Sequence, residues 1–108
     1  MSQVRRNLEA MLARGQDNAL LRFSLGNLCL QADEPALAVE HLAEATVRDP
    51  DYSAAWKLLG KARVETGDVA GAAQAWRQGI EVAERRGDKQ AAREMAVFLR
   101  RVERTGQR

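Results

Sequence analysis

Residues 53–86 read SAAWKLLGKARVETGDVAGAAQAWRQGIEVAERR, and this stretch decides the fold. Two alanine-rich runs lie on either side of the break Thr66-Gly67-Asp68. Alanine and leucine favour helix, and no alternating β-branched run competes with them. The aspartate of the break can accept hydrogen bonds from the free amides at the start of a helix. The stretch therefore predicts two helices joined by a short turn.

The same pattern occurs 34 residues earlier, in residues 19–52. The two stretches share Leu25/Leu59, Gly26/Gly60, Ala36/Ala70 and Ala38/Ala72. A glycine inside a helix costs about 1 kcal/mol relative to alanine, so a glycine repeated at one period needs a packing reason. We expect each glycine to face an alanine on the second helix of its pair, where small residues let two backbones approach closely. The facing pairs would be Gly26 with Ala38 and Gly60 with Ala72.

The repeat resembles the tetratricopeptide repeat, a helix–turn–helix unit of about 34 residues. Residues 53–86 carry Trp56, Leu59, Gly60, Ala72 and Trp76 at the family's positions, and residues 19–52 carry Leu25, Gly26, Ala38, Leu42, Ala45 and Pro50. The departures are Arg22 at a large aromatic position, Cys29 and Arg63 at a tyrosine position, and Glu84 at the terminal proline. The resemblance implies an all-α fold, an α-solenoid of about six helices.

Both flanks resemble partial repeats. Residues 2–14 match a second helix, with Val4, Leu8 and Met11 aligned to Ala38, Leu42 and Ala45. At an offset of 36, Ala92, Met95, Ala96 and Leu99 align with Trp56, Leu59, Gly60 and Arg63 of a first helix. The prediction is one domain over residues 1–108, with a half-repeat at 2–14, repeats at 19–52 and 53–86, a closing helix at 88–104 and a disordered tail at 105–108.

The composition is that of a globular protein, with 45% hydrophobic and 30% charged residues. No apolar run could cross a membrane and no secretory leader is present, so we expect a cytoplasmic protein without membrane insertion. The sequence holds no catalytic motif or phosphate-binding loop, and one histidine and one cysteine leave little material for a metal site. We therefore expect no enzyme activity, no metal and no cofactor. His41 is expected on a solvated face, and Cys29, Trp56 and Trp76 are expected in the core.

The resemblance implies that the first helix of each repeat lines a concave surface where peptides bind. In residues 19–52 the lining positions are Leu20, Phe23, Asn27, Leu30 and Gln31, and in residues 53–86 they are Ala54, Lys57, Lys61, Val64 and Glu65. On the closing helix they are Gln90, Arg93, Val97, Arg100 and Arg101. A helical wheel independently separates the basic side chains of this last helix from its apolar arc.

Charge is distributed unevenly along the chain. Residues 1–84 carry nine Lys and Arg against twelve Asp and Glu, whereas residues 85–108 carry eight against three, so the net charges are −3 and +5. We expect Phe23 and Leu30 to form an apolar floor and Lys57, Lys61, Arg93 and Arg100 to form a basic wall. The predicted function is that of a non-enzymatic adaptor that binds an acidic and apolar segment of another protein.

Three alternatives stay open. The Arg-rich C-terminal helix could bind nucleic acid or another polyanion. The apolar face of residues 19–52 could form a structural homodimer, so that the protein is a monomer or a weak homodimer. The N-terminal half-repeat could instead cover Phe23. Binding of a chaperone C-terminus is disfavoured, because Phe23 and Leu58 replace a lysine and an asparagine of the family's carboxylate clamp and only Asn27 is retained.

Overall fold

The computed structural model describes residues 2–106, and these residues form six helices and no strand. The helices are α1 (Gln3–Ala13), α2 (Ala19–Gln31), α3 (Pro35–Arg48), α4 (Ser53–Glu65), α5 (Val69–Arg85) and α6 (Lys89–Gly106). The prediction of an all-α solenoid is confirmed. Helix α6 continues through Gly106, so residues 105 and 106 are helical rather than part of a tail, and residues 107–108 lie outside the described part.

The turns between the helices follow from their residues. The Asp68 side chain accepts a hydrogen bond from the Gly71 amide at 2.9 Å and so caps the start of α5. Gly67 takes the left-handed backbone conformation that glycine adopts without strain. Asp33, which stands 34 residues earlier, takes the same conformation with φ 60°. Aspartate tolerates this region better than most residues, and the two turns therefore have the same shape.

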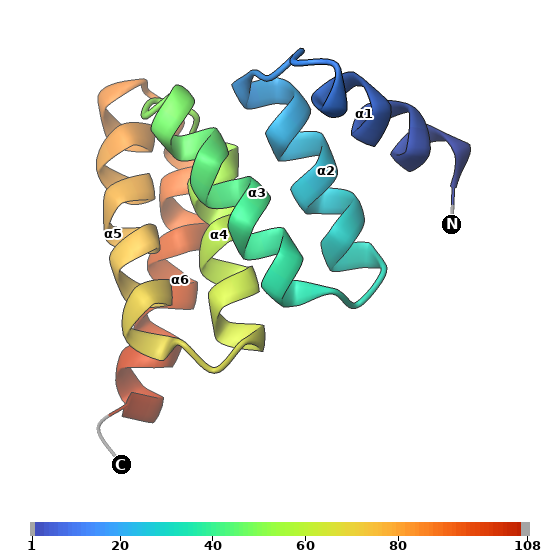
Figure 1. Cartoon of the computed structure of the whole chain (residues 1–108). Coiled ribbons are helices and arrows are strands. Elements are labelled where there is room, and N and C mark those ends of the chain that lie inside the picture. Colours follow the sequence, from blue (N-terminus) through green and yellow to red (C-terminus); the bar gives the residue numbers. More distant parts are fainter. Residues whose placement is uncertain (1, 107–108) are drawn as a thin grey trace.

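Successive helices pack against each other in antiparallel pairs. Helices α2, α4 and α6 lie side by side in one layer, and α3 and α5 form the other layer (Figure 1). Helix α6 contacts α5 and α4, whereas α1 contacts only α2 among the helices of residues 2–106. The layer of first helices is the one that the repeat pattern predicts to carry the concave surface.

The core consists of two clusters of buried side chains. One joins both repeats and contains Cys29, Ala38, Leu42, Leu59, Ala62 and Ala75. The other lies between α5 and α6 and contains Ala72, Ala73, Trp76, Ala83, Ala92, Met95 and Val102. The predicted burial of Cys29 and Trp76 is confirmed, while Trp56 is half-buried and donates from Nε1 to the Pro50 carbonyl at 2.8 Å.

Gly26 and Gly60 do not face Ala38 and Ala72, which contradicts the expectation from the sequence. A β-carbon on Gly26 would meet the side chain of Leu42, and one on Gly60 would meet the indole of Trp76. Each glycine therefore leaves a notch on the first helix that a large side chain of the second helix fills. The large residue lies one turn beyond the expected alanine, so the packing is that of a large residue against glycine.

His41 is buried, which contradicts the expectation of a solvated face. Its side chain lies on α3, with 8% of the residue exposed, and its Nδ1 is 3.2 Å from Nη1 of Arg22. Arg22 also binds both carboxylate oxygens of Asp17 at 2.8 Å. The equivalent positions of the second repeat hold Trp56 and Ala75. An Arg–His pair thus stands at the positions where the second repeat has Trp and Ala, and the contact with Arg22 accompanies the burial of the histidine.

Candidate functional site: the concave groove

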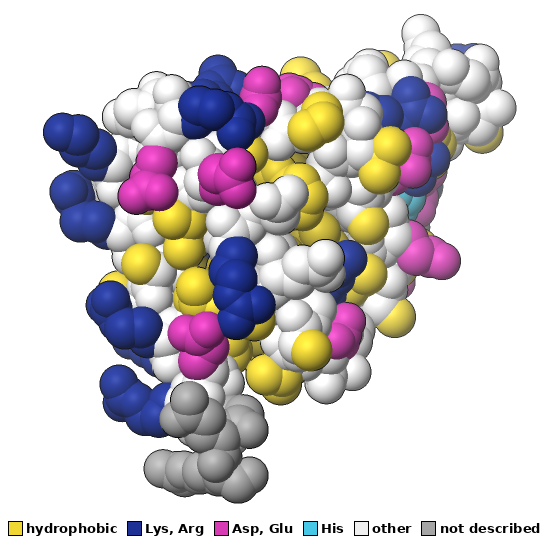
Figure 2. Space-filling model, turned by 90° about the vertical axis from the view of Figure 1, so that its left-hand side faces the viewer, with side chains coloured by type: hydrophobic (Ala, Val, Ile, Leu, Met, Phe, Trp, Pro, Cys, Tyr) yellow, Lys and Arg dark blue, Asp and Glu magenta, His cyan; other side chains and the backbone are white. Residues whose placement is uncertain are grey.

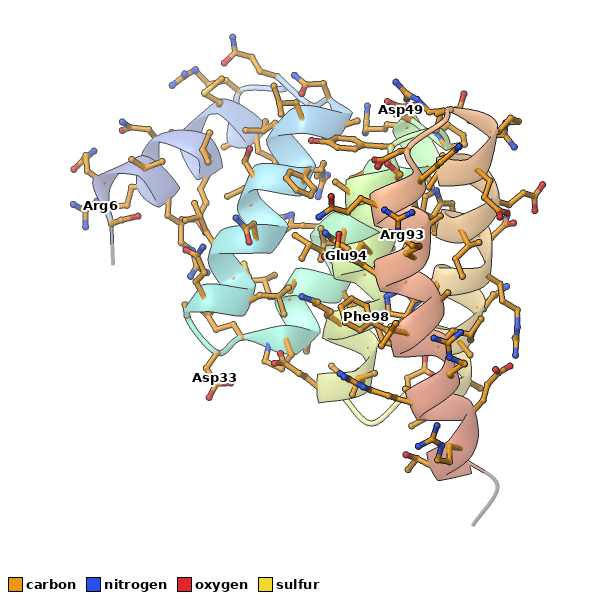
Figure 3. The ribbon with its side chains drawn as sticks, turned by 180° about the vertical axis from the view of Figure 1, so that it is seen from behind. Arg6, Asp33, Asp49, Arg93, Glu94 and Phe98 are labelled. Carbon is orange, nitrogen blue, oxygen red and sulfur yellow. The ribbon has the colours of Figure 1, made fainter. Side chains whose placement is uncertain are left out.

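Helices α2, α4 and α6 lie side by side in one layer (Figure 3), and we call the solvent-facing side of this layer, which bears two hollows between α4 and α6, the groove. The period of 3.6 residues turns the large buried side chains Leu25 and Leu59 away from it and leaves other positions facing solvent. Among the predicted lining positions of α2 and α4, Asn27 and Ala54 are half-buried, and the exposed ones are Leu20, Gln31, Lys61, Val64 and Glu65. Gln31 lines a separate hollow together with Ser2 and Arg5. Leu20, at 64% exposure, and Val64, at 39%, are the two large apolar side chains that this layer exposes most.

Phe23 and Leu30 lie on the flank of α2 that faces α4, and both are half-buried. The ring of Phe23 stacks on Tyr52, with centroids 4.9 Å apart and an interplanar angle of 29°. Burial raises the pKa of the Tyr52 hydroxyl. Leu30 packs against the first core cluster. Phe23 therefore holds α2 to Tyr52 at the start of α4, and Leu30 holds α2 to the core.

Two of the predicted groove cations contact groups of the chain itself. Lys57 Nζ lies 3.7 Å from the carboxylate of Glu94, and Lys61 Nζ lies 5.0 Å from the centre of the Phe98 ring. Figure 3 shows Glu94 and Phe98 on the side of α6 next to α4. Both contacts join α4 to α6, so these lysines hold two helices of the groove together.

The arginines of α6 are placed differently. Arg93, Arg100 and Arg101 are exposed and form no ion pair within residues 2–106, and Val97 between them is half-buried. Glu94 instead lies 3.7 Å from Lys57, and Glu65 lines one hollow together with Lys61. The groove therefore has mixed charge at its centre and uncompensated positive charge along the α6 edge.

Two hollows follow the boundary between α4 and α6. One of about 280 Å³ is lined by Ser53, Ala54, Lys57, Asp88, Gln90, Ala91 and Glu94. The other, of about 250 Å³, is lined by Lys61, Val64, Glu65, Trp76 and Phe98. Each is large enough for one side chain. No group of three or more His, Cys, Asp or Glu residues among those described is placed to hold a metal ion.

The structure adds three residues to the predicted set. Glu94, Tyr52 and Phe98 contact Lys57, Phe23 and Lys61 respectively. Glu94 could have been found from the sequence, because Arg101 lies seven residues further along the same helix face. Tyr52 precedes its helix and lies outside the periodic positions, so nothing in the pattern indicates it. Phe98 packs against the core cluster between α5 and α6 but is only half-buried, so its ring is also within reach of Lys61.

Known proteins share this arrangement. A family model for the tetratricopeptide repeat matches residues 19–62. A TPR repeat-containing protein of Pseudomonas aeruginosa is 59% identical over 97 residues, which span 90% of this chain and 92% of that protein. The chain belongs to the tetratricopeptide repeat family. The resemblance predicted from Trp56, Leu59, Gly60, Ala72 and Trp76 is thereby confirmed.

Two further proteins are similar to this chain. The solution structure of a protein from Bordetella parapertussis superposes with a TM-score of 0.81 at 48% identity, covering 97% of this chain and 91% of that one. A heat-shock protein cognate co-chaperone of Aspergillus fumigatus is 39% identical over 66 residues, which are 61% of this chain and 19% of that protein. The family is one of non-enzymatic modules that mediate protein–protein interaction. None of the helices in residues 2–106 is long and apolar enough to span a membrane.

Proposed function

We propose that this tetratricopeptide repeat domain is an adaptor that binds an extended segment of another protein along the groove of α2, α4 and α6. The observation that carries the proposal is the exposure of Leu20 and Val64 on this layer. Neither side chain belongs to a core cluster, so the fold does not require a large apolar residue at either position. Exposed apolar side chains beside hollows are a common feature of interaction surfaces.

The charge of the α6 edge supports a segment that also carries acidic residues. Arg93, Arg100 and Arg101 have no partner within the described residues, so a carboxylate of the ligand would displace water rather than an existing ion pair. Exposed ion pairs contribute only about 0–1 kcal/mol each. Apolar contacts at Leu20, Val64 and the two hollows would therefore carry most of the affinity. We expect dissociation constants in the micromolar range, which correspond to a binding free energy of about −8 kcal/mol.

The co-chaperone relative does not point to capture of a chaperone C-terminus by this chain. A clamp for two carboxylates needs cations and amides at positions that face the groove. Phe23 stands at one such position and stacks on Tyr52. Leu58 stands at another and packs against the first core cluster. We propose instead a ligand that presents apolar side chains to the hollows and carboxylates to α6.

A random-peptide display selection on the immobilised protein tests the proposal. Enriched peptides should combine apolar and acidic residues, and amide chemical shifts on titration should change along α2, α4 and α6. The double variant Leu20→Glu/Val64→Glu should weaken binding about tenfold or more, because it places charge at both exposed apolar sites. Both side chains are outside the core, so the variant should keep its circular dichroism spectrum.

Val47→Glu is the matched control. Val47 lies on α3, in the other layer, and is 71% exposed, so it is an apolar surface residue away from the groove. The control should bind selected peptides as the wild type does. Equal affinity for the groove variant and the control, or shift changes confined to α3 and α5, would refute the groove as the binding site.

A further inference from the structure

The face of α6 that bears Ala96 corresponds to the faces of α2 and α4 on which the following helices pack, and we call it the outer face of α6. On α2, Gly26 faces Leu42 of the following helix, and on α4, Gly60 faces Trp76 of the following helix. The residue of α6 aligned with these glycines is Ala96. No helix follows α6 within the described residues, and Ala96 is half-exposed. Within residues 2–106, α6 therefore has no following helix of the kind that covers α2 and α4.

This open face has an apolar floor. Leu99 and Ala96 are half-buried side chains on it, and Leu99 also packs against the core between α5 and α6. A hollow of about 410 Å³ lies at its upper end, lined by Glu84, Gly87, Lys89, Ala92 and Arg93. Figure 2 looks onto the side formed by α5 and α6 and shows hydrophobic side chains exposed in patches. The floor therefore consists of Ala96 and the exposed part of Leu99.

The rim of the face is basic. Lys89, Arg93, Arg100 and Arg104 recur at helical spacing along α6, are exposed, and form no ion pair within residues 2–106. Figure 2 shows Lys and Arg side chains gathered along one edge of this side. Across the face, Arg77 of α5 and Glu103 of α6 form an ion pair, with Nη2 and Oε2 2.8 Å apart. An occupant that runs along α6 therefore meets mainly positive charge.

We propose that the outer face of α6 docks an amphipathic helix of a partner protein, with a large apolar side chain over Ala96 and acidic residues toward Lys89, Arg93 and Arg100. The helix would continue the solenoid as α3 and α5 do. The apolar floor favours a protein helix over nucleic acid, because phosphates would use the rim and leave the floor exposed. The charge of the rim disfavours a second copy of this chain, because two α6 faces would bring arginines together.

A pair of synthetic helices tests the proposal. Both carry the sequence of residues 69–85, whose Trp76 fills the equivalent position on α4. The acidic peptide has Arg77→Glu and Arg85→Glu, and the basic peptide has Glu81→Lys and Glu84→Lys, so their formal side-chain charges are −4 and +4. With the full chain at low salt, fluorescence anisotropy should show the acidic peptide binding about tenfold tighter than the basic one. Salt should reduce the difference.

Two protein variants locate the site. Arg93→Glu/Arg100→Glu changes only exposed side chains and should reverse the preference between the two peptides. Ala96→Glu places a charge on the floor and should weaken both peptides by about tenfold or more. The groove variant Leu20→Glu/Val64→Glu should leave both affinities unchanged, which separates this surface from the proposed groove function.

The proposal is overturned by any of four results. The first is that neither peptide binds the wild-type chain, and the second is that the groove variant abolishes binding. The third is that a single- or double-stranded oligonucleotide binds the wild type but not Arg93→Glu/Arg100→Glu, while the acidic peptide does not bind. The fourth is that sedimentation of the wild-type chain shows a dimer that Ala96→Glu disrupts, which would mean that a second copy occupies the face.

Discussion

Gly60 lies directly against the indole ring of Trp76, so that a β-carbon at position 60 would overlap the Nε1 edge of that ring. The same nitrogen donates a hydrogen bond to the Lys57 carbonyl at 3.0 Å, which holds the ring in place. The indole is 3% exposed and belongs to the cluster between α5 and α6. The close approach of α4 and α5 therefore depends on one glycine and one tryptophan.

Gly60→Ala should destabilise the protein by about 1–3 kcal/mol, as overpacking of a core does, although alanine is the better helix former. For a domain of this size the melting temperature should fall by about 4–8 °C for each kcal/mol. Trp76→Leu in the same chain should recover part of the loss caused by the methyl group, because leucine leaves room for it. An unchanged or higher melting temperature for Gly60→Ala, measured by circular dichroism, would contradict the packing.

The stack of Phe23 on Tyr52 should contribute about 0.5–1.5 kcal/mol beyond the area that it buries. A double-mutant cycle of Phe23→Leu and Tyr52→Leu, followed by urea denaturation, measures this coupling energy. Additive effects of the two substitutions would show that the rings do not interact in solution. The result also decides how the groove is tested, since charged residues at position 23 would remove a packing contact as well as a binding surface.

Stability should depend on pH through His41. Burial, followed by the nearby Arg22, lowers the pKa of its imidazole in the folded chain. The unfolded chain then takes up a proton near the ordinary value of 6.5, where the folded chain does not. The stabilisation is complete above that value and is lost as the pH falls through the pKa of the folded state. Urea denaturation at about pH 7.5 and about pH 5 should show the wild type losing more stability than His41→Gln.

Asp17 also makes stability depend on pH, but over a lower pH range than His41. A hydrogen bond from Arg22 lowers the pKa of the Asp17 carboxyl from its ordinary 3.8, and Arg48 adds to the shift. The stabilisation by Asp17 is complete above that value and is lost only as the pH falls through the lower, folded pKa. The contribution of Asp17 to stability is therefore constant between pH 7.5 and 5 and does not add to the change measured for His41. Identical pH dependence of the wild type and His41→Gln would contradict the buried Arg22–His41 contact.

Arg5 should control the attachment of α1. Its guanidinium is buried on α2 and binds Glu34 at 2.5 Å and Glu9 at 3.4 Å, while α1 contacts no other helix of the described chain. In Arg5→Ala the amides of residues 3–13 should exchange with deuterium several-fold faster, with little change in α4 and α5. Arg6→Ala is the control, because Arg6 is exposed and bonds only Gln3 of its own helix. Equal exchange in both variants would show that apolar contacts alone hold α1.

The helices, the repeat period and the family could all be predicted from the sequence, because they depend on residues near one another in the chain. Caps such as Asp68 define the turns, and the spacing of Leu25 and Leu59 defines the buried faces. The groove positions follow from the same period, and so the layer of α2, α4 and α6 was anticipated. The contacts that the side chains at these positions make could not be predicted: Lys57 is paired with Glu94, and Phe23 is stacked on Tyr52.

The sequence by itself determined which face of each helix is apolar, since a period of 3.6 residues is a property of one helix. Only the tertiary structure decided which side chain fills each position on the neighbouring helix. Gly60 receives Trp76 and not Ala72, His41 is buried beside Arg22, and Ala96 is left uncovered. The physical reason is that the axial shift between two packed helices depends on how their large and small side chains interlock, and a shift of one turn exchanges one partner for another.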